Sequence, residues 1–453
     1  MKRLAGLLTA LLFFQNLNAQ EKSTGDSTEA RSLISFLKEG EVSGHIRNYF
    51  MTTDNRNGKD YYADAIGGML RYETKTYKGF QVGISGIFSY KAFASDLNDP
   101  DAQTGKTSKW ERELFDVNHP DNCNDLDRLE ELYIKYKWDN SYITYGKIPV
   151  EYTPLLNESD GRMKPFAFQG GWLHHSIKND QWIIDAGWFH KVSPRSMTEW
   201  FPMDEAIGMT DNGFQPDGTK AKYAHHIASK GIGSAHLGKK SEFWKLNFWN
   251  VYLDKVINTS WAQVEYSRAH WFLGAVWSYQ IPLQNQQQLA YENRYVQPDE
   301  NGQVLSLAGK YKEGATELKI TYSRSFKTGR YLFPKELGRD QFYTSMPRNR
   351  IEGIGDANIL GIGLQHHWKH LFINIDASTS FGIDPEDLTF NKYGIDDFYQ
   401  VNTRIHYEFT KFLKGLNIDL LYVWKENKNL HQPLMAYQKS DYNQINLITN
   451  FKF

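Results

Sequence analysis

The chain has 453 residues with 52 basic against 53 acidic side chains, so no strong electrostatic field points to nucleic acid or an anionic membrane surface as a partner. Its single cysteine, Cys123, excludes a disulfide framework. Aromatic residues make up 15% of a chain whose mean hydropathy is −0.60, a combination that fits sheets with one wet face and one apolar face.

The first residues have the order of a secretory signal peptide. Lys2 and Arg3 give a positive start, and residues 4–14 form an apolar run that is too short to span a bilayer as a helix. We expect cleavage after Ala19, which makes residues 1–19 the signal and residues 20–40 a polar N-terminal segment with one or two helical turns. No later stretch approaches about 18 consecutive apolar residues, so we predict no membrane helix after the signal.

From residue 41 onward, polar and apolar residues alternate with a period of two, the pattern of strands with two different faces. The alternation is clear in residues 66–73, 80–88, 131–138, 401–409 and 416–424. The last residues continue it, since Ile445, Leu447, Phe451 and Phe453 are apolar between polar neighbours. We therefore expect the chain to end inside a strand that pairs with the first strand, because an open edge in lipid leaves backbone groups unsatisfied.

The connections alternate between short and long. Short turns such as residues 78–79, 139–140 and 313–314 carry Gly, Asn or Asp, which suit positive φ. The other connections, among them residues 91–125, 196–222, 285–303 and 326–354, are long and polar. Short periplasmic turns and long extracellular loops are typical of an outer-membrane β-barrel.

Charged residues in the strands indicate where water lies. A basic residue that faces lipid at the bilayer midplane costs about 2–4 kcal/mol, so Arg71, Lys135 and Arg404 are expected to face a lumen. The soluble alternatives are a β-sandwich or a β-helix, but the hairpins continue to residue 453 without a domain boundary or a repeat. We predict an all-β fold, one transmembrane antiparallel β-barrel over residues 41–453 with about 18 strands, wide enough for an aqueous channel.

Several stretches resemble the OprD-type porins, substrate-selective channels of Gram-negative outer membranes. They are GEVSGHIRNYF (40–50), residues 60–85, YGKIPVEYTPLLNESDGRMKPFAFQGG (145–171), AGKYKEGATELKITYSRS (308–325), residues 355–370 and residues 399–422. The resemblance covers residues 40–453. It implies an 18-stranded barrel, narrowed by loops folded into the lumen, that passes small solutes, often carboxylates including amino acids, along basic residues.

The resemblance also implies partners and a location. The strand that ends at Phe453 resembles the C-terminal signal recognised by the barrel-assembly machinery. Outer-membrane lipid and small solutes are the other expected partners, and the barrel is expected to be a monomer or a loose trimer. The chain would reach the outer membrane after secretion across the inner membrane.

Residues 152–171 are the best candidate for a constriction loop. Pro154 and Pro165 stiffen the backbone, while Asp160 and Arg162 supply the fixed charges that a lumen loop needs to select by size and sign. The alternative is a packing role, in which Asp160 and Arg162 pair with each other or anchor the loop to the wall.

The strands offer further permeation candidates, namely Arg47, Arg71, Arg404 and Glu408. Guanidinium groups bind carboxylates bidentately, so such residues could form a track for an anionic group. The alternative is that they pair with carboxylates across strands, for instance Glu73 and Glu131, and only keep the wall polar.

We predict no catalytic residue, no cofactor and no metal site. The histidine pairs 174–175, 225–226 and 366–367 would point to opposite faces of a strand and so could not chelate from one side. A barrel hydrolase and a barrel that binds through its loops as an adhesin are the alternatives to a channel, and a closed, non-conducting lumen would favour either.

Overall fold

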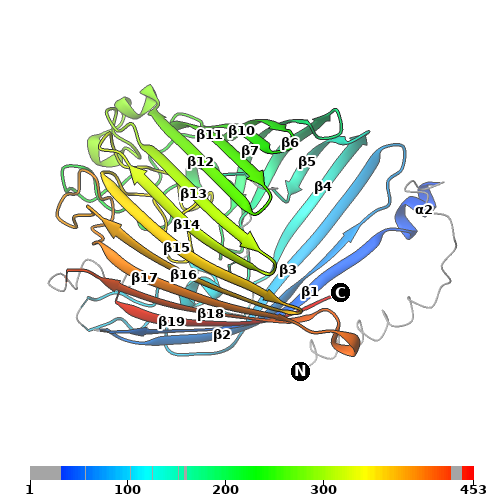
Figure 1. Cartoon of the computed structure of the whole chain (residues 1–453), viewed down its shortest axis with the longest axis horizontal. Coiled ribbons are helices and arrows are strands. Elements are labelled where there is room, and N and C mark those ends of the chain that lie inside the picture. Colours follow the sequence, from blue (N-terminus) through cyan, green and yellow to red (C-terminus); the bar gives the residue numbers. More distant parts are fainter. Residues whose placement is uncertain are drawn as a thin grey trace.

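The computed structural model describes residues 32–56, 58–102, 104–124, 126–150, 153–157, 161–429 and 441–453. Within these ranges the chain forms one antiparallel sheet of 19 strands (Figure 1). Eighteen of them follow one another around a closed barrel, and β8 (Phe201–Pro202) is a short addition beside β7. The predicted all-β barrel of about 18 strands is confirmed.

The strands of the barrel are β1 (Glu41–Asn55), β2 (Tyr61–Glu73), β3 (Phe80–Ala94), β4 (Arg128–Trp138), β5 (Ser141–Ile148), β6 (Ala167–Ile177), β7 (Trp182–Ser193), β9 (Ile232–Lys240), β10 (Trp244–Leu253), β11 (Ile257–Arg268), β12 (Trp271–Pro282), β13 (Gln303–Glu313), β14 (Thr316–Ser325), β15 (Ala357–Trp368), β16 (Leu371–Phe381), β17 (Phe398–Glu408), β18 (Leu416–Asn427) and β19 (Tyr442–Lys452).

Helical structure in the described residues is short. It comprises α2 (Leu33–Lys38), α3 (Met203–Ala206) and the 3-10 turns η2 (Glu111–Leu114), η3 (Gln284–Gln288), η4 (Tyr291–Asn293) and η5 (Lys411–Leu413). None of these helices has the length and apolarity to cross a membrane.

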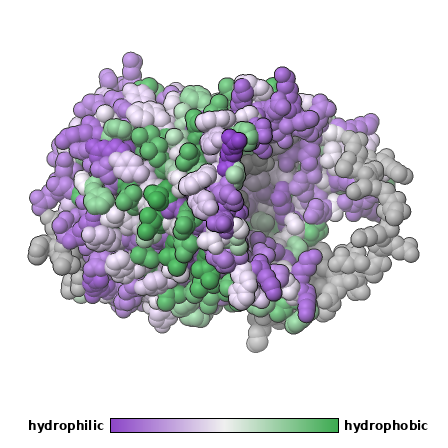
Figure 2. All heavy atoms as spheres, in the orientation of Figure 1, coloured by the Kyte–Doolittle hydropathy of each residue, from purple (hydrophilic) through white to green (hydrophobic). Residues whose placement is uncertain are grey.

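The period of two in the sequence separates a lipid-facing from a lumen-facing surface. In β2, Tyr62, Ile66 and Leu70 are 45–47% exposed on the outside, whereas Ala63 and Ala65 are fully buried on the inside. Figure 2 shows apolar side chains gathered across the middle of the visible wall, with hydrophilic ones toward both ends. This is the distribution that a bilayer selects, because charge is costly only in the hydrocarbon zone.

The last strand closes the barrel, as predicted. β19 pairs with β1 in antiparallel register, with Arg47 opposite Asn450. The seam is completed by two backbone hydrogen bonds between Gly44 and Phe453, at 3.0 and 3.1 Å. Figure 1 shows the C-terminus beside β1.

The two ends of the barrel differ as expected. Turns such as Lys78–Gly79, both with positive φ, join strands directly at one end. The connections β3–β4, β5–β6, β7–β9, β12–β13, β14–β15 and β16–β17 are long and lie at the other end (Figure 1). The connections β1–β2 and β10–β11 are short exceptions at this second end.

Several long loops fold into the barrel. The β14–β15 loop (residues 326–356) buries Leu332, Phe333 and Phe342 in one core with Trp261 of β11 and Val304 of β13. The β5–β6 and β7–β9 loops contribute to the same core. The prediction that at least one loop folds into the lumen is therefore confirmed, and packed apolar side chains narrow the interior.

Candidate functional site

Four loops bring charged side chains together inside the barrel. We call Arg162, Arg195, Arg339 and Arg348, which surround the carboxylate of Glu113, the arginine cluster. Glu113 belongs to η2 in the β3–β4 loop, and the arginines come from the β5–β6, β7–β9 and β14–β15 loops. Four cations around one anion leave this part of the interior positive.

Glu113 forms ion pairs with two members of the arginine cluster. Its Oε2 lies 2.6 Å from Nη2 of Arg162 and accepts a hydrogen bond from Nη2 of Arg195 at 2.8 Å. Arg162 is only 1% exposed. A buried charge needs such a partner, so this shared carboxylate ties three loops together.

The other two arginines are less committed. Arg348 donates through Nε to Gln444 Oε1 of β19 at 2.7 Å, and its guanidinium lies 4.6 Å from the centroid of the Trp110 ring. Within the described part of the chain, the guanidinium of Arg339 has no ion pair or hydrogen bond. The side chains of Arg339 and Arg348 are both partly exposed. These two guanidinium groups can therefore bind an anion without first breaking an ion pair with a carboxylate.

The electrostatics of the loops reflect this excess of positive charge. Burial would raise the pKa of Glu113, but Arg195 and Arg162 outweigh it and hold the pKa of this carboxyl well below its usual range. Burial, and then the charge of Arg195, keeps the pKa of Arg339 well below its ordinary value. Burial lowers the pKa of Arg195 to about 9, although Glu113 opposes the shift. An added anion would relieve this repulsion.

Lys109 and Trp110 border the arginine cluster. The ammonium of Lys109 lies 4.3 Å from the centroid of the Trp110 ring, and Arg348 also lies over that ring. Trp110 precedes Glu111, whose buried carboxyl accepts hydrogen bonds from Thr53 of β1 and from Ser108. Burial raises the pKa of Glu111, which lowers its tendency to offset the positive charge.

Arg47 links the wall to the cluster. Its Nη1 donates to the carbonyl oxygen of Arg162 at 2.8 Å, and its Nε donates to Asn450 Oδ1 of β19 at 2.6 Å. Tyr49, two residues along β1, donates to Asn446 Oδ1 at 3.1 Å. The β5–β6 loop is thus anchored at the seam of the barrel.

The remaining wall candidates lie near the short-turn end. Arg71 pairs with Glu73 at 2.8 Å and with Glu131 at 3.1 Å. Arg404 donates through Nε to both carboxylate oxygens of Asp419, at 2.8 and 2.9 Å. The side chain of Glu408 is 69% exposed and lies 3.5 Å from His406. Strand partners therefore engage these two arginines, as the sequence alternative describes, and neither belongs to the arginine cluster.

The candidate constriction segment needs two adjustments. Residues 167–171 belong to β6, so the loop ends at Phe166 rather than at Gly171. Arg162 pairs with Glu113 of another loop, while Asp160 lies outside the described residues.

Sequence reasoning missed Arg195, Arg339, Arg348 and Glu113. The run RNR at residues 348–350 was the available local signal for Arg348. No comparable signal marks Arg195 or Glu113, because their proximity arises only when separate loops meet.

The histidine pairs do not form a common site. His174 contacts Asp185 at 2.6 Å, whereas its neighbour His175 contacts Ser141 at 3.0 Å. His225 and His226 lie in a loop and not on a strand, which corrects the expectation for that pair. Among the described residues, no group of three His, Cys, Asp or Glu side chains could hold a metal ion.

Comparisons with known proteins agree with this architecture. A family model described as outer membrane porin, OprD family, matches residues 34–346. Solved structures with the same fold include Pseudomonas aeruginosa OccK9 (OpdG), at 14% identity and a TM-score of 0.71, covering 92% of this chain and 99% of that one. Acinetobacter baumannii OccAB4 gives 15% identity and a TM-score of 0.70, covering 91% and 98%. A search of curated protein sequences finds no match.

Proposed function

The chain belongs to the OprD family of outer membrane porins, and on this premise we propose that it is a passive diffusion channel that favours small anionic solutes, carboxylates and amino acids among them. It carries out no covalent chemistry in this proposal. Selectivity comes from a lumen narrowed by loops and from fixed charges at the narrowing.

The observation that carries the proposal is the arginine cluster. Arg162 and Arg195 are held by Glu113, whereas Arg339 and Arg348 are partly exposed and have no carboxylate partner in the described part of the chain. A planar guanidinium presents paired donors that match a carboxylate. A carboxylate that passes through the lumen can therefore replace its hydrogen bonds to water with hydrogen bonds from these guanidinium groups.

Glu113 gives the cluster a second role. By fixing Arg162 and Arg195 it keeps two cations beside the path without leaving their charges uncompensated. Its carboxylate, which the four arginines surround, also offers an acidic group to the ammonium of a zwitterion. Binding at such a site must remain weak enough for release, as in any conducting filter.

The candidates predicted from sequence take separate parts in this proposal. Arg162, with Asp160 in the same loop, forms the constriction, and Arg47 supports it from the wall. Arg71, Arg404 and Glu408 line the wider approach at the periplasmic end, where paired charges keep the wall wet. Their direct contact with a solute is a prediction.

We further propose how the protein reaches its location. It is secreted across the inner membrane with residues 1–19 as signal, and the barrel-assembly machinery recognises the strand that ends at Phe453. The barrel works as a monomer or a loose trimer, since each barrel encloses its own path.

Single-channel recording in a planar bilayer under a salt gradient tests the proposal. We expect discrete conductance steps and a reversal potential on the anion-selective side. Arg348→Gln should lower the anion-to-cation permeability ratio severalfold, because it removes from the path a cation that has no carboxylate partner among the described residues. Lys230→Gln, which removes the same charge from an exposed loop position, should leave the ratio unchanged. A cation-selective wild type, or no steps from folded protein, would refute the proposal.

A further inference from the structure

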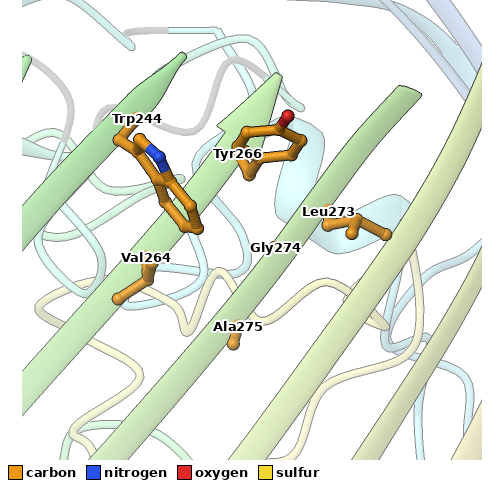
Figure 3. Close-up of a pocket in the computed structure, with 6 residues that line it drawn as sticks. All are labelled: Trp244, Val264, Tyr266, Leu273, Gly274 and Ala275. Atoms are coloured by element: carbon orange, nitrogen blue, oxygen red, sulfur yellow. The ribbon is translucent and has the colours of Figure 1, made fainter. Parts of the chain in front are cut away.

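The lipid-facing wall is not uniform. An apolar groove with a volume of about 380 Å³ lies on it, lined by Trp244, Val264, Tyr266, Leu273, Gly274 and Ala275 (Figure 3). The residues come from the start of β10, the end of β11 and the start of β12. This places the groove at the short-turn end of the barrel, which is the periplasmic end in outer-membrane barrels.

The register of the strands explains the groove. Tyr266 stands opposite Trp244 on one side and Leu273 on the other, which makes a row of large side chains. In the next outward-facing row, farther from the short turns, Ala275 stands opposite Val264. Because a methyl group occupies a position between larger neighbours, the surface is hollowed there. Figure 3 shows the Trp244 and Tyr266 rings side by side above this hollow.

A cation lies beside the groove. The guanidinium of Arg268 is 5.3 Å from the centroid of the Phe243 ring, and that ring is 6.4 Å from the ring of Tyr266. Arg268 shares the outward face of β11 with Val264 and Tyr266, since side chains alternate along a strand. In the described residues it has no carboxylate within ion-pair distance.

The surrounding turns add to this positive charge. Besides Arg268, the exposed charged residues at the short-turn ends of β9 to β13 are basic in four cases and acidic in two: Lys239, Lys240, Lys245 and Lys312 against Glu242 and Glu313. By alternation, Lys245 and Lys312 lie on the lumen side of their strands. Trp and Tyr rings in such a position belong at the level of lipid headgroups. An apolar slot beneath aromatic rings and beside unpaired positive charge matches a phospholipid with an anionic head.

We propose that this groove is a specific site for an anionic phospholipid of the periplasmic leaflet. One acyl chain lies over Gly274 and Ala275, and the headgroup phosphate meets Arg268. A second copy of this chain fits less well, because a two-fold contact through the same patch would place the basic turns of both copies together. The inference does not depend on which solute the channel passes.

Native mass spectrometry of the detergent-purified protein tests the site, with phosphatidylglycerol and phosphatidylethanolamine added in separate titrations. We expect one phosphatidylglycerol to be retained more strongly than phosphatidylethanolamine. Ala275→Phe should abolish the preference by filling the groove. Arg268→Gln should weaken retention about fivefold, which corresponds to one basic residue near a lipid surface.

Two matched variants serve as controls. Ala377→Phe adds the same bulk to an outward position of β16, and Lys369→Gln removes a charge from the β15–β16 turn. Both should retain phosphatidylglycerol like the wild type, and heat-modifiable gel migration should confirm folding of every variant. Equal retention of both lipids in all variants would overturn the proposal, as would loss of barrel oligomers in Ala275→Phe with lipid retention unchanged.

Discussion

Lys109 illustrates how the interior alters the charge of a single residue. Its ammonium packs against the Trp110 ring, and burial followed by the charge of Lys335 lowers its pKa to about 7, although Glu113 and Asp211 oppose the shift. An ordinary lysine stays charged to about pH 10. Lys109 therefore carries its positive charge below pH 7 and loses it as the pH rises above 7.

This titration predicts pH-dependent selectivity. Between pH 6 and pH 8 we expect the anion-to-cation permeability ratio of the wild type to fall about twofold, because the site beside the arginine cluster becomes less positive. Lys109→Arg should shrink this step, since arginine stays charged throughout. Burial also lowers the pKa of Lys164 to about 7, so a smaller step can persist. Reversal potentials at both pH values provide the measurement, and an undiminished step in Lys109→Arg would contradict the assignment.

At the scale of elements, the β14–β15 loop does most to fill the barrel. Leu332, Phe333, Leu337 and Phe342 are buried against lumen-facing residues of the wall. The same loop carries Arg339 and Arg348, so its apolar packing fixes the position of two members of the arginine cluster. Burial of such side chains contributes about 1.5–3 kcal/mol each, which holds the loop inside without covalent links.

Removing the apolar side chains of this loop should widen the channel. Replacement of residues 333–342 by a Gly-Ser linker leaves β14 and β15 intact while removing two buried phenylalanines and Arg339. We expect single-channel conductance to rise at least twofold and discrimination between anions and cations to fall. Deletion of residues 386–389 from the β16–β17 loop is the control, because its side chains are mostly exposed, and it should leave conductance unchanged. An unchanged conductance in the first variant would mean that the narrowing lies elsewhere.

At the scale of the whole molecule, stability depends on closure. Every strand of the barrel has two neighbours, and β1 and β19 supply the final pairing. Within lipid an unpaired backbone group costs several kcal/mol, so the seam should matter as much as any internal pairing although it joins the two ends of the fold.

A single residue at the seam tests this point. Thr449 lies in β19 between Asn48 of β1 and Ile418 of β18. Thr449→Pro removes the backbone donor in a strand that is paired on both sides, and we expect little or no folded barrel. Thr449→Val keeps the donor and should fold normally. Heat-modifiable migration on gels reports folding, and a normal yield of folded Thr449→Pro would show that the seam tolerates disruption.

Much of the architecture could be predicted from the sequence. Alternation identified the outward residues of β2, and the short turn at Lys78–Gly79 identified the end of the barrel where strands are joined by short turns. These inferences succeed because they depend only on neighbours along the chain: lipid penalises charge on one face, and positive φ requires particular residues. The inward fold of the β14–β15 loop was not predicted, since its apolar residues are scattered among polar ones.

The candidate site shows the limit of such reasoning. Arg162 and Arg47 were both candidates from the sequence, and the structure brings them into contact through the Arg162 carbonyl. Arg71 and Arg404 are equally basic and equally inward, yet the strands beside them provide carboxylates. The alternation within a strand predicts whether a side chain faces the lumen or the lipid, but it does not predict which charged side chain will lie next to it.

The sequence by itself therefore determined the closed barrel and the lipid-facing surface, because a bilayer imposes its pattern on every strand. The porin family was indicated separately, by the resemblance of several stretches to its members, and the family model matches residues 34–346. Only the tertiary structure decided which charges face each other inside the barrel. Glu113, Arg162, Arg195 and Arg348 lie on four separate loops, and electrostatic interactions depend on distances in space, which the order of residues along the chain does not specify.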